Sequence, residues 1–329
     1  MKKNPPIILK TIDQKNIHRC LEENYNSLSI DWFVVLKKWM SNSYSVFNDH
    51  KKYLILIYLV KKTFDFYYTK FTKLSLHQFF SLKKIELEKF NIINVARELK
   101  IPKETTRRKI GELVSDNIIK KTKSGISFKT IYFKDKFNRD NKDFLKLIYV
   151  FTNKFSIKLT EDKVVREKIK PELIEKAIVE NFSYVWKIFF EMQIPFLIDW
   201  KIFFEDLETW YIWESSWINQ NCEIQKYLKL KNLKIKNIKH LFEAQVKVGD
   251  KIGRSAMSIS TLTRIPRATV IRKLKKLIKN KHLIVNDKKL YYPNMKNYEE
   301  SRVSKLTTLN IQRLSVFLNK ILNLTIASK

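Results

Sequence analysis

Helical periodicity dominates the pattern of apolar and polar positions along the chain, and strand candidates are confined to two short stretches. Ahead of the first of these, residues 91–100 place Val95 and Leu99 on one face of a short amphipathic helix. Pro102 suits the first turn of a following helix. We therefore predict a second helix over 103–116, joined to the first by a tight turn.

A β-hairpin is predicted next. Residues 118–123 and 126–133 read as two short strands on either side of Ser124-Gly125, a pair typical of tight turns. The order of elements predicted over 91–133 is thus helix, turn, helix and hairpin.

The same order returns toward the C-terminal end of the chain. Its members are a helix near 258–264, a second helix over 267–280, and a hairpin over 283–292 that turns at Asn286-Asp287. The chain contains only four glycines and seven prolines. Outside the two hairpins we therefore predict a mainly helical protein, with aromatic-rich helices ahead of each motif and a helix at the C-terminal end.

The two motifs are related in sequence. Residues 101–110 align with residues 265–274 at an offset of 164, and isoleucine, proline, threonine, arginine and lysine recur at matching positions. The helices upstream correspond more loosely, because 31–39 followed by 53–66 resembles 185–190 followed by 206–217. A pattern that repeats in this way predicts an internal duplication.

The duplication predicts two units. The first covers 1–150 with its motif at about 91–133, and the second covers 151–329 with its motif at about 254–292 and the C-terminal helix. The boundary is expected near 140–165, where a polar, charged stretch interrupts the apolar pattern.

The net charge of the chain indicates the kind of partner it binds. The chain has 65 Lys and Arg against 33 Asp and Glu, a formal charge of +32, which favours a polyanionic partner. Lysine enrichment from an AT-rich genome is an alternative explanation. Arginine argues against it, because seven of the 12 arginines fall within the two motifs, which make up about a quarter of the chain.

Several classes of protein are disfavoured. Cys20 and Cys222 have no second Cys or His at ligand spacing, which argues against a disulfide framework or zinc site and favours reduced thiols in the cytoplasm. The most apolar stretch, 53–60, is far shorter than the ~20 residues of a membrane helix. The N-terminus does not read as a signal peptide. No phosphate loop or nucleophile motif occurs, so we expect neither an enzyme nor a cofactor.

The motif order resembles the winged helix-turn-helix of bacterial regulators such as the MarR and GntR families. The resemblance depends on helix–turn–helix–hairpin order and on a Thr-x-x-Arg step at 105–108 and again at 269–272. It implies two winged helix-turn-helix units whose second helices enter the major groove of DNA. It also implies that the hairpins, or wings, meet the DNA backbone or minor groove.

Residue chemistry then suggests the contacts. Arginine can form paired hydrogen bonds with guanine or phosphate, threonine near a helix N-terminus can bond phosphate, and wing lysines suit phosphate. The predicted DNA-binding residues are Lys103, Thr105, Arg107, Arg108, Lys109, Lys120, Lys121 and Lys123 in the first motif, and Arg267, Thr269, Arg272, Lys273, Lys275, Lys276, Lys288 and Lys289 in the second. The alternative for each is a solvated helix face.

A tryptophan-rich segment over 182–217 has two interpretations. Five of the seven tryptophans lie within it. Packing in a helical core is the common use of such a stripe, and a binding site for a protein partner or effector is the alternative.

The leading hypothesis is a transcriptional regulator that binds double-stranded DNA as a covalent pseudo-dimer, each unit reading a different half-site. The alternatives are a plasmid-type replication initiator with two winged helices, and a winged-helix scaffold that binds protein. Operator sequence, activation or repression, and association of two chains are left open.

Overall fold

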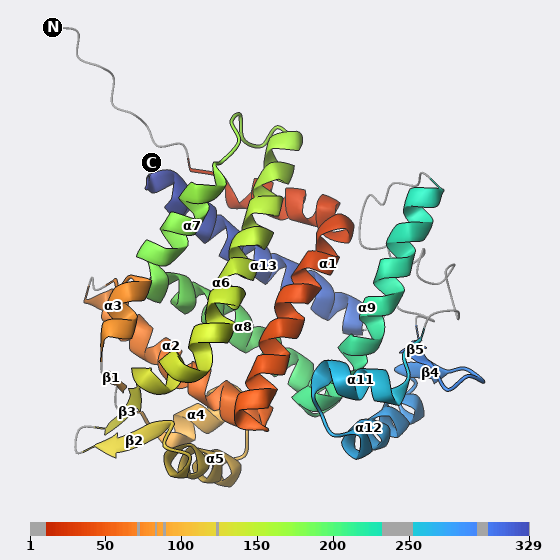
Figure 1. Ribbon diagram of the computed structural model, residues 1–329, viewed down its shortest axis with the longest axis horizontal. Coiled ribbons are helices and arrows are strands. Elements are labelled where there is room, and N and C mark those ends of the chain that lie inside the picture. Colours follow the sequence, from red (N-terminus) through yellow and green to blue (C-terminus); the bar gives the residue numbers. More distant parts are fainter. Residues whose placement is uncertain are drawn as a thin grey trace, which may run out of the picture.

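The protein is mainly helical with two small antiparallel sheets (Figure 1). The computed structural model describes residues 11–70, 73–82, 84–87, 90–122, 125–231, 253–294 and 302–328. The helices are α1 (Gln14–Phe47), α2 (His50–Thr69), α3 (Leu76–Ser81), α4 (Ile92–Leu99), α5 (Lys103–Ser115), α6 (Thr130–Glu161), α7 (Pro171–Glu180), α8 (Phe182–Phe204), α9 (Leu207–Leu230), α11 (Ala256–Thr263), α12 (Arg267–Lys279) and α13 (Arg302–Ala327). The strands are β1 (Lys84–Leu87), β2 (Ile119–Thr122), β3 (Gly125–Lys129), β4 (Leu283–Val285) and β5 (Tyr291–Pro293).

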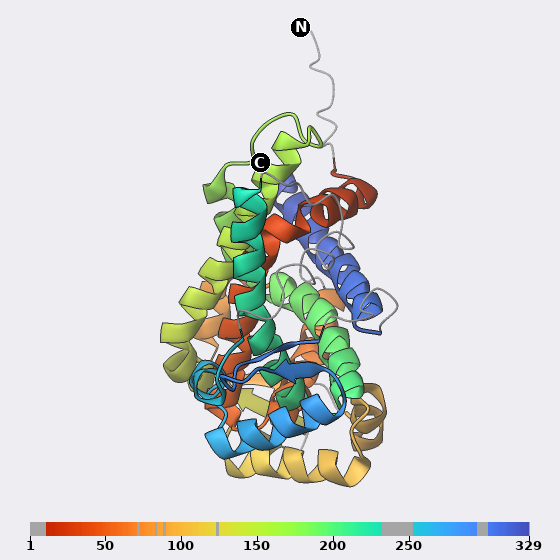
Figure 2. The same ribbon diagram turned by 90° about the vertical axis from the view of Figure 1, so that its right-hand side faces the viewer.

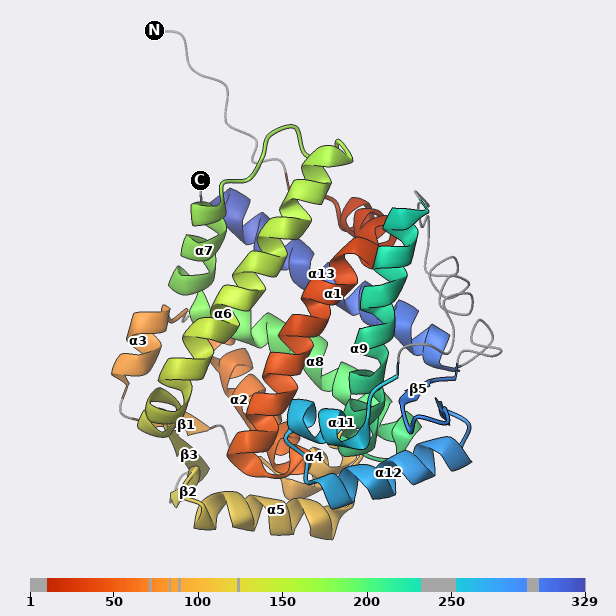
Figure 3. The ribbon, with the colours of Figure 1, turned by 45° about the vertical axis from the view of Figure 1, so that its right-hand side comes forward.

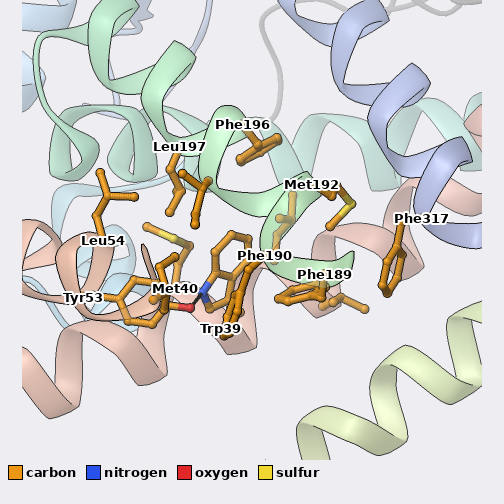
Figure 4. Close-up of a cluster of buried hydrophobic side chains, with 14 of the residues drawn as sticks. Trp39, Met40, Tyr53, Leu54, Phe189, Phe190, Met192, Phe196, Leu197 and Phe317 are labelled. Atoms are coloured by element: carbon orange, nitrogen blue, oxygen red, sulfur yellow. Dashed lines mark hydrogen bonds between the residues drawn. The ribbon is translucent and has the colours of Figure 1, made fainter. Parts of the chain in front are cut away.

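Long helices from both halves of the sequence share one hydrophobic core. Trp39 of α1, Phe189 of α8 and Phe317 of α13 meet there, with ring centroids 5.7 Å apart for the first pair and 5.5 Å for the second (Figure 4). Tyr53 of α2 joins them, because its hydroxyl accepts hydrogen bonds from the indole of Trp39 and from Gln193. Each buried aromatic ring contributes on the order of 1.5–3 kcal/mol.

The first helix–hairpin segment packs against α2. It contains α4, α5 and a three-stranded sheet with the order β1-β3-β2. Helices α4 and α5 match the two helices predicted from the sequence. Strand β1 was not predicted; its Ile85 is fully buried and pairs with Phe128.

The predicted extent of the first hairpin was wrong at its far end. The second strand was expected to reach residue 133, but β3 ends at Lys129 and α6 begins at Thr130. The registers of β1 and β2 with β3 reach only Lys129 and Phe128, so a longer strand would have no paired neighbour there. Helix α6 also buries Phe151 and Phe155 against the core, and a helix anchored in this way extends readily toward its N-terminus.

The second helix–hairpin segment contains α11, α12, β4 and β5, close to the bounds predicted for its helices and hairpin. Arg254 forms an isolated antiparallel bridge with Tyr291 and so adds a short third edge to the β4–β5 pair. Gly253 allows this approach, because a Cβ atom there would lie 2.8 Å from the carbonyl carbon of Leu290.

The division of the chain near residue 150 falls inside α6, which ends at Glu161, within the predicted boundary region of 140–165. The tryptophan-rich segment forms α8 and much of α9, and four of its five tryptophans are buried. None of the described helices is both long and apolar enough to cross a membrane.

Candidate nucleic-acid interface

Helix α5 presents one buried and one exposed face. It begins directly after Pro102, whose backbone (φ −53°, ψ 138°) turns the chain out of the preceding loop. The buried face of α5 consists of Thr106, Ile110 and Leu113. The hydroxyl of Thr106 donates to the carbonyl of Pro102 at 3.2 Å and so closes the first turn.

The exposed face of α5 carries Lys103, Arg107 and Arg108. Both arginine side chains are 69% exposed. Arg107 lies 2.7 Å from Glu104, and Arg108 lies 3.9 Å from Glu112. Exposed pairs of this kind are weak and exchange readily with water, so both guanidinium groups can turn to a stronger anion.

Lys109 differs from these neighbours because it points toward the helical body. Its side chain is only 13% exposed and contacts the carboxylates of Asp49 and Glu112, each at 2.8 Å. Burial alone would raise the pKa of Asp49, but hydrogen bonds from Lys109 and the backbone of Lys51 hold that pKa below its ordinary value. Lys109 is therefore engaged in an internal ion pair and not free to contact DNA.

Helix α12 repeats this arrangement with a stronger positive charge. It follows Pro266, whose backbone (φ −53°, ψ 137°) matches that of Pro102. Its exposed residues include Arg267, Arg272 and Lys275, and its sequence contains no acidic residue. Lys276 is less available, because it lies 2.6 Å from Glu205.

Lys273 holds the same place in α12 as Lys109 in α5. It is 11% exposed and pairs with the carboxylate of Asp206. Asp206 also accepts a hydrogen bond of 2.7 Å from the backbone of Thr209 and so caps the start of α9. Lys273 thus fastens α12 to α9, as Lys109 fastens α5 to α2.

The predicted DNA-binding threonines and hairpin lysines differ in how far they are exposed. Thr105 and Thr269 are half-buried at the first turns of their helices. Lys120, Lys288 and Lys289 are exposed. The side chain of Lys121 and the whole of Lys123 lie outside the described residues.

Backbone geometry recurs between the two segments at the offset of 164. The turn after each second helix is closed by a hydrogen bond from Ile118 N to Leu113 O (3.0 Å) and from His282 N to Leu277 O (2.9 Å). A left-handed residue follows each first helix and each second helix. These residues are Lys100 (φ 52°) and Arg264 (φ 62°), then Asn117 (φ 56°) and Lys281 (φ 59°).

Both segments lie at the same end of the molecule (Figures 1 and 2), and the view of Figure 3 places α5 and α12 along that end. A long helix from the second half of the chain contacts the first segment, and a long helix from the first half contacts the second segment. Lys201 of α8 donates to the carbonyls of Leu99 (2.5 Å) and Lys100 (2.7 Å) at the end of α4. Arg264, at the end of α11, donates to Ser45 of α1 at 2.5 Å.

Sequence reasoning missed Asp49 and Asp206 as the acceptors that fix α5 and α12. The available signal was a polar-Asp pair directly before an aromatic helix, which is a helix-cap pattern.

Among the described residues no group of three or more His, Cys, Asp or Glu side chains is placed to hold a metal ion. Comparison with protein-family models, curated protein sequences and solved structures finds no match for this chain.

Proposed function

We propose that this protein binds double-stranded DNA through the exposed faces of α5 and α12, and that it acts as a transcriptional regulator. The observation that carries the proposal is the pair of basic helix faces at one end of the molecule, each preceded by the same proline turn and followed by a strand pair. Arg107 and Arg108 on one face and Arg272 on the other are exposed, and their guanidinium groups would bond to base edges or phosphates.

The order of elements supports two winged helix-turn-helix units. In the first segment, β1 precedes α4 and α5, and β2 and β3 form the wing of a β1-β3-β2 sheet. In the second, the bridge at Arg254 takes the place of β1 and β4–β5 that of the wing. Lys103, Lys275 and the exposed wing lysines would then neutralise phosphates.

The recurrence of the turn geometry supports an internal duplication, and the reciprocal contacts support a pseudo-dimer. In a symmetric dimer a residue of one copy contacts the other copy, and the reverse contact is also made. The contacts of α8 with α4 and of α1 with α11 follow this pattern at the level of whole helices, although different residues make them. The two faces differ in charge, because α5 carries Glu104 where α12 carries Ala268. The two helices would therefore bind two DNA half-sites of different sequence.

Affinity for random-sequence duplex DNA across a salt series tests the proposal. Wild type is compared with Arg108→Ala/Arg272→Ala and with a control, Arg166→Ala/Lys168→Ala. The control makes the same change in net charge at the connection between α6 and α7, at the opposite end of the molecule (Figure 1).

The arginine variant should lose about tenfold in affinity or more for each contact removed, and its log–log salt slope should fall by about two. The control variant should follow wild type. Weak binding that does not depend on salt, or equal losses in both variants, would contradict DNA binding through these helices and would favour a protein-binding scaffold. Footprints on repeated sites beside an origin would indicate a replication initiator instead of a regulator.

A further inference from the structure

A cavity lies within the helical body, and half of the residues that line it are aromatic. Helix α1 contributes Trp32, α8 contributes Trp200, and α9 contributes Trp213 and Trp217. Residues of α13 complete the wall. The cavity measures about 590 Å³, including the part that opens to solvent.

Glu214 of α9 supplies the only carboxyl group of this wall among the described residues, which include no basic side chain there. It is 7% exposed, and no described residue forms an ion pair or hydrogen bond with it. Tyr25 of α1 is the one other titratable group of the described lining, while α8 and α13 contribute none. An ionised carboxylate is costly in such surroundings unless a partner compensates its charge.

Burial accordingly raises the pKa of Glu214 to about 8, so its carboxyl group holds a proton at neutral pH. Two hydrogen-bond donors of the wall are also buried without a partner, Nε1 of Trp200 and Nδ2 of Asn310. The cavity thus combines one unmatched acid, two unmatched donors and several tryptophan rings.

We propose that this cavity binds a small organic cation with a flat apolar group, with its ammonium against Glu214 and its apolar part between the tryptophans. A cation is attracted both by the carboxylate and by the negative faces of aromatic rings. An anion would find no basic side chain in the described lining. The site does not depend on DNA binding, and the assay below contains no DNA, so the two proposals succeed or fail separately.

The test uses three ligands that share one ring and differ in charge: benzylammonium, benzyl alcohol and benzoate. Tryptophan fluorescence and titration calorimetry follow binding to the full chain. Benzylammonium should bind about tenfold more tightly than benzyl alcohol, and benzoate should not bind. Calorimetry at pH 7 in buffers of different ionisation heat should show a proton released per cation bound, because Glu214 must ionise to pair with it.

Glu214→Gln is the matched variant, since it keeps the shape of the side chain and removes its charge. It should bind benzyl alcohol as wild type does, lose the preference for benzylammonium and abolish proton release. A Tm no lower than that of wild type shows that it folds. The proposal is overturned if benzylammonium does not bind at millimolar concentration, if it binds no better than benzyl alcohol, or if Glu214→Gln retains the preference.

Discussion

The Nζ atom of Lys109 lies 2.8 Å from a carboxylate oxygen of Asp49, the residue that caps α2. This ion pair joins the helix with the exposed arginines to the aromatic helix behind it. Lys273 makes the equivalent contact with Asp206 at the start of α9. One lysine in each basic helix therefore positions that helix, while the arginines of the same helix are exposed.

Lys109→Ala should lower the free energy of unfolding by about 1–3 kcal/mol, because it removes the side-chain partner of the half-buried Asp49 and one of the cations that contact Glu112. Lys103→Ala, on the exposed face of the same helix, should change it by less than about 0.5 kcal/mol. Urea denaturation at neutral pH measures both. Equal effects of the two substitutions would argue against a structural role for Lys109.

Glu104 distinguishes the two basic faces, since it lies 2.7 Å from Arg107 and the equivalent residue of α12 is Ala268. If both faces approach phosphates, Glu104→Ala should raise DNA affinity about two- to fivefold by removing a repulsive charge. Ala268→Glu should lower affinity by a similar factor. Binding measured at low salt tests both; if neither variant differs from wild type, α5 and α12 do not face the DNA.

His50 should make the protein less stable in acid. Burial lowers its pKa from 6.5 to about 4, although the backbone of Met40 and the carboxylates of Asp49 and Asp206 act in the opposite direction. Its folded pKa lies below its unfolded pKa, so its contribution is complete above pH 6.5 and is lost as pH falls toward 4. The loss amounts to as much as about 3 kcal/mol.

His50→Phe, which retains an aromatic ring beside Tyr44 and Tyr211, should reduce the pH dependence of unfolding in that window, and His282, whose pKa burial also lowers, should account for part of the remainder. His77→Gln, at an exposed position, is the control and should leave the wild-type slope intact. The assignment of the acid slope to His50 fails if His50→Phe keeps it.

The glycines at 111 and 253 should respond in opposite directions to alanine. A Cβ atom at Gly253 would lie 2.8 Å from Leu290, so Gly253→Ala should destabilise the second helix–hairpin segment by more than about 1 kcal/mol. At Gly111, inside α5, a Cβ atom meets nothing within 4 Å, and Gly111→Ala should stabilise by about 0.5–1 kcal/mol. Thermal unfolding ranks the two; a stabilising Gly253→Ala would contradict the close approach.

Local signals in the sequence predicted much of the two helix–hairpin segments. Periodic apolar residues and the prolines at 102 and 266 placed α5 and α12 within a residue or two of their observed bounds. The same periodicity left Arg107, Arg108 and Arg272 on the exposed faces, where the structure has them. These features depend on neighbours a few positions away, so one stretch of sequence contains the information that determines them.

The tertiary structure decided the features that depend on residues distant in sequence. Strand β1 needs β3 as its partner, 40 or so residues away, and β3 stops where its paired registers stop. The sequence does not distinguish Lys109 and Lys273 from the basic residues around them. In the structure each forms an ion pair with an aspartate at the start of another helix and is largely buried. Glu214 lies in an ordinary helical pattern, and only the meeting of α1, α8, α9 and α13 encloses it among tryptophans. Sequence thus determined the local elements and the overall charge, whereas long-range packing determined which charges are buried, because burial depends on every element that covers a residue.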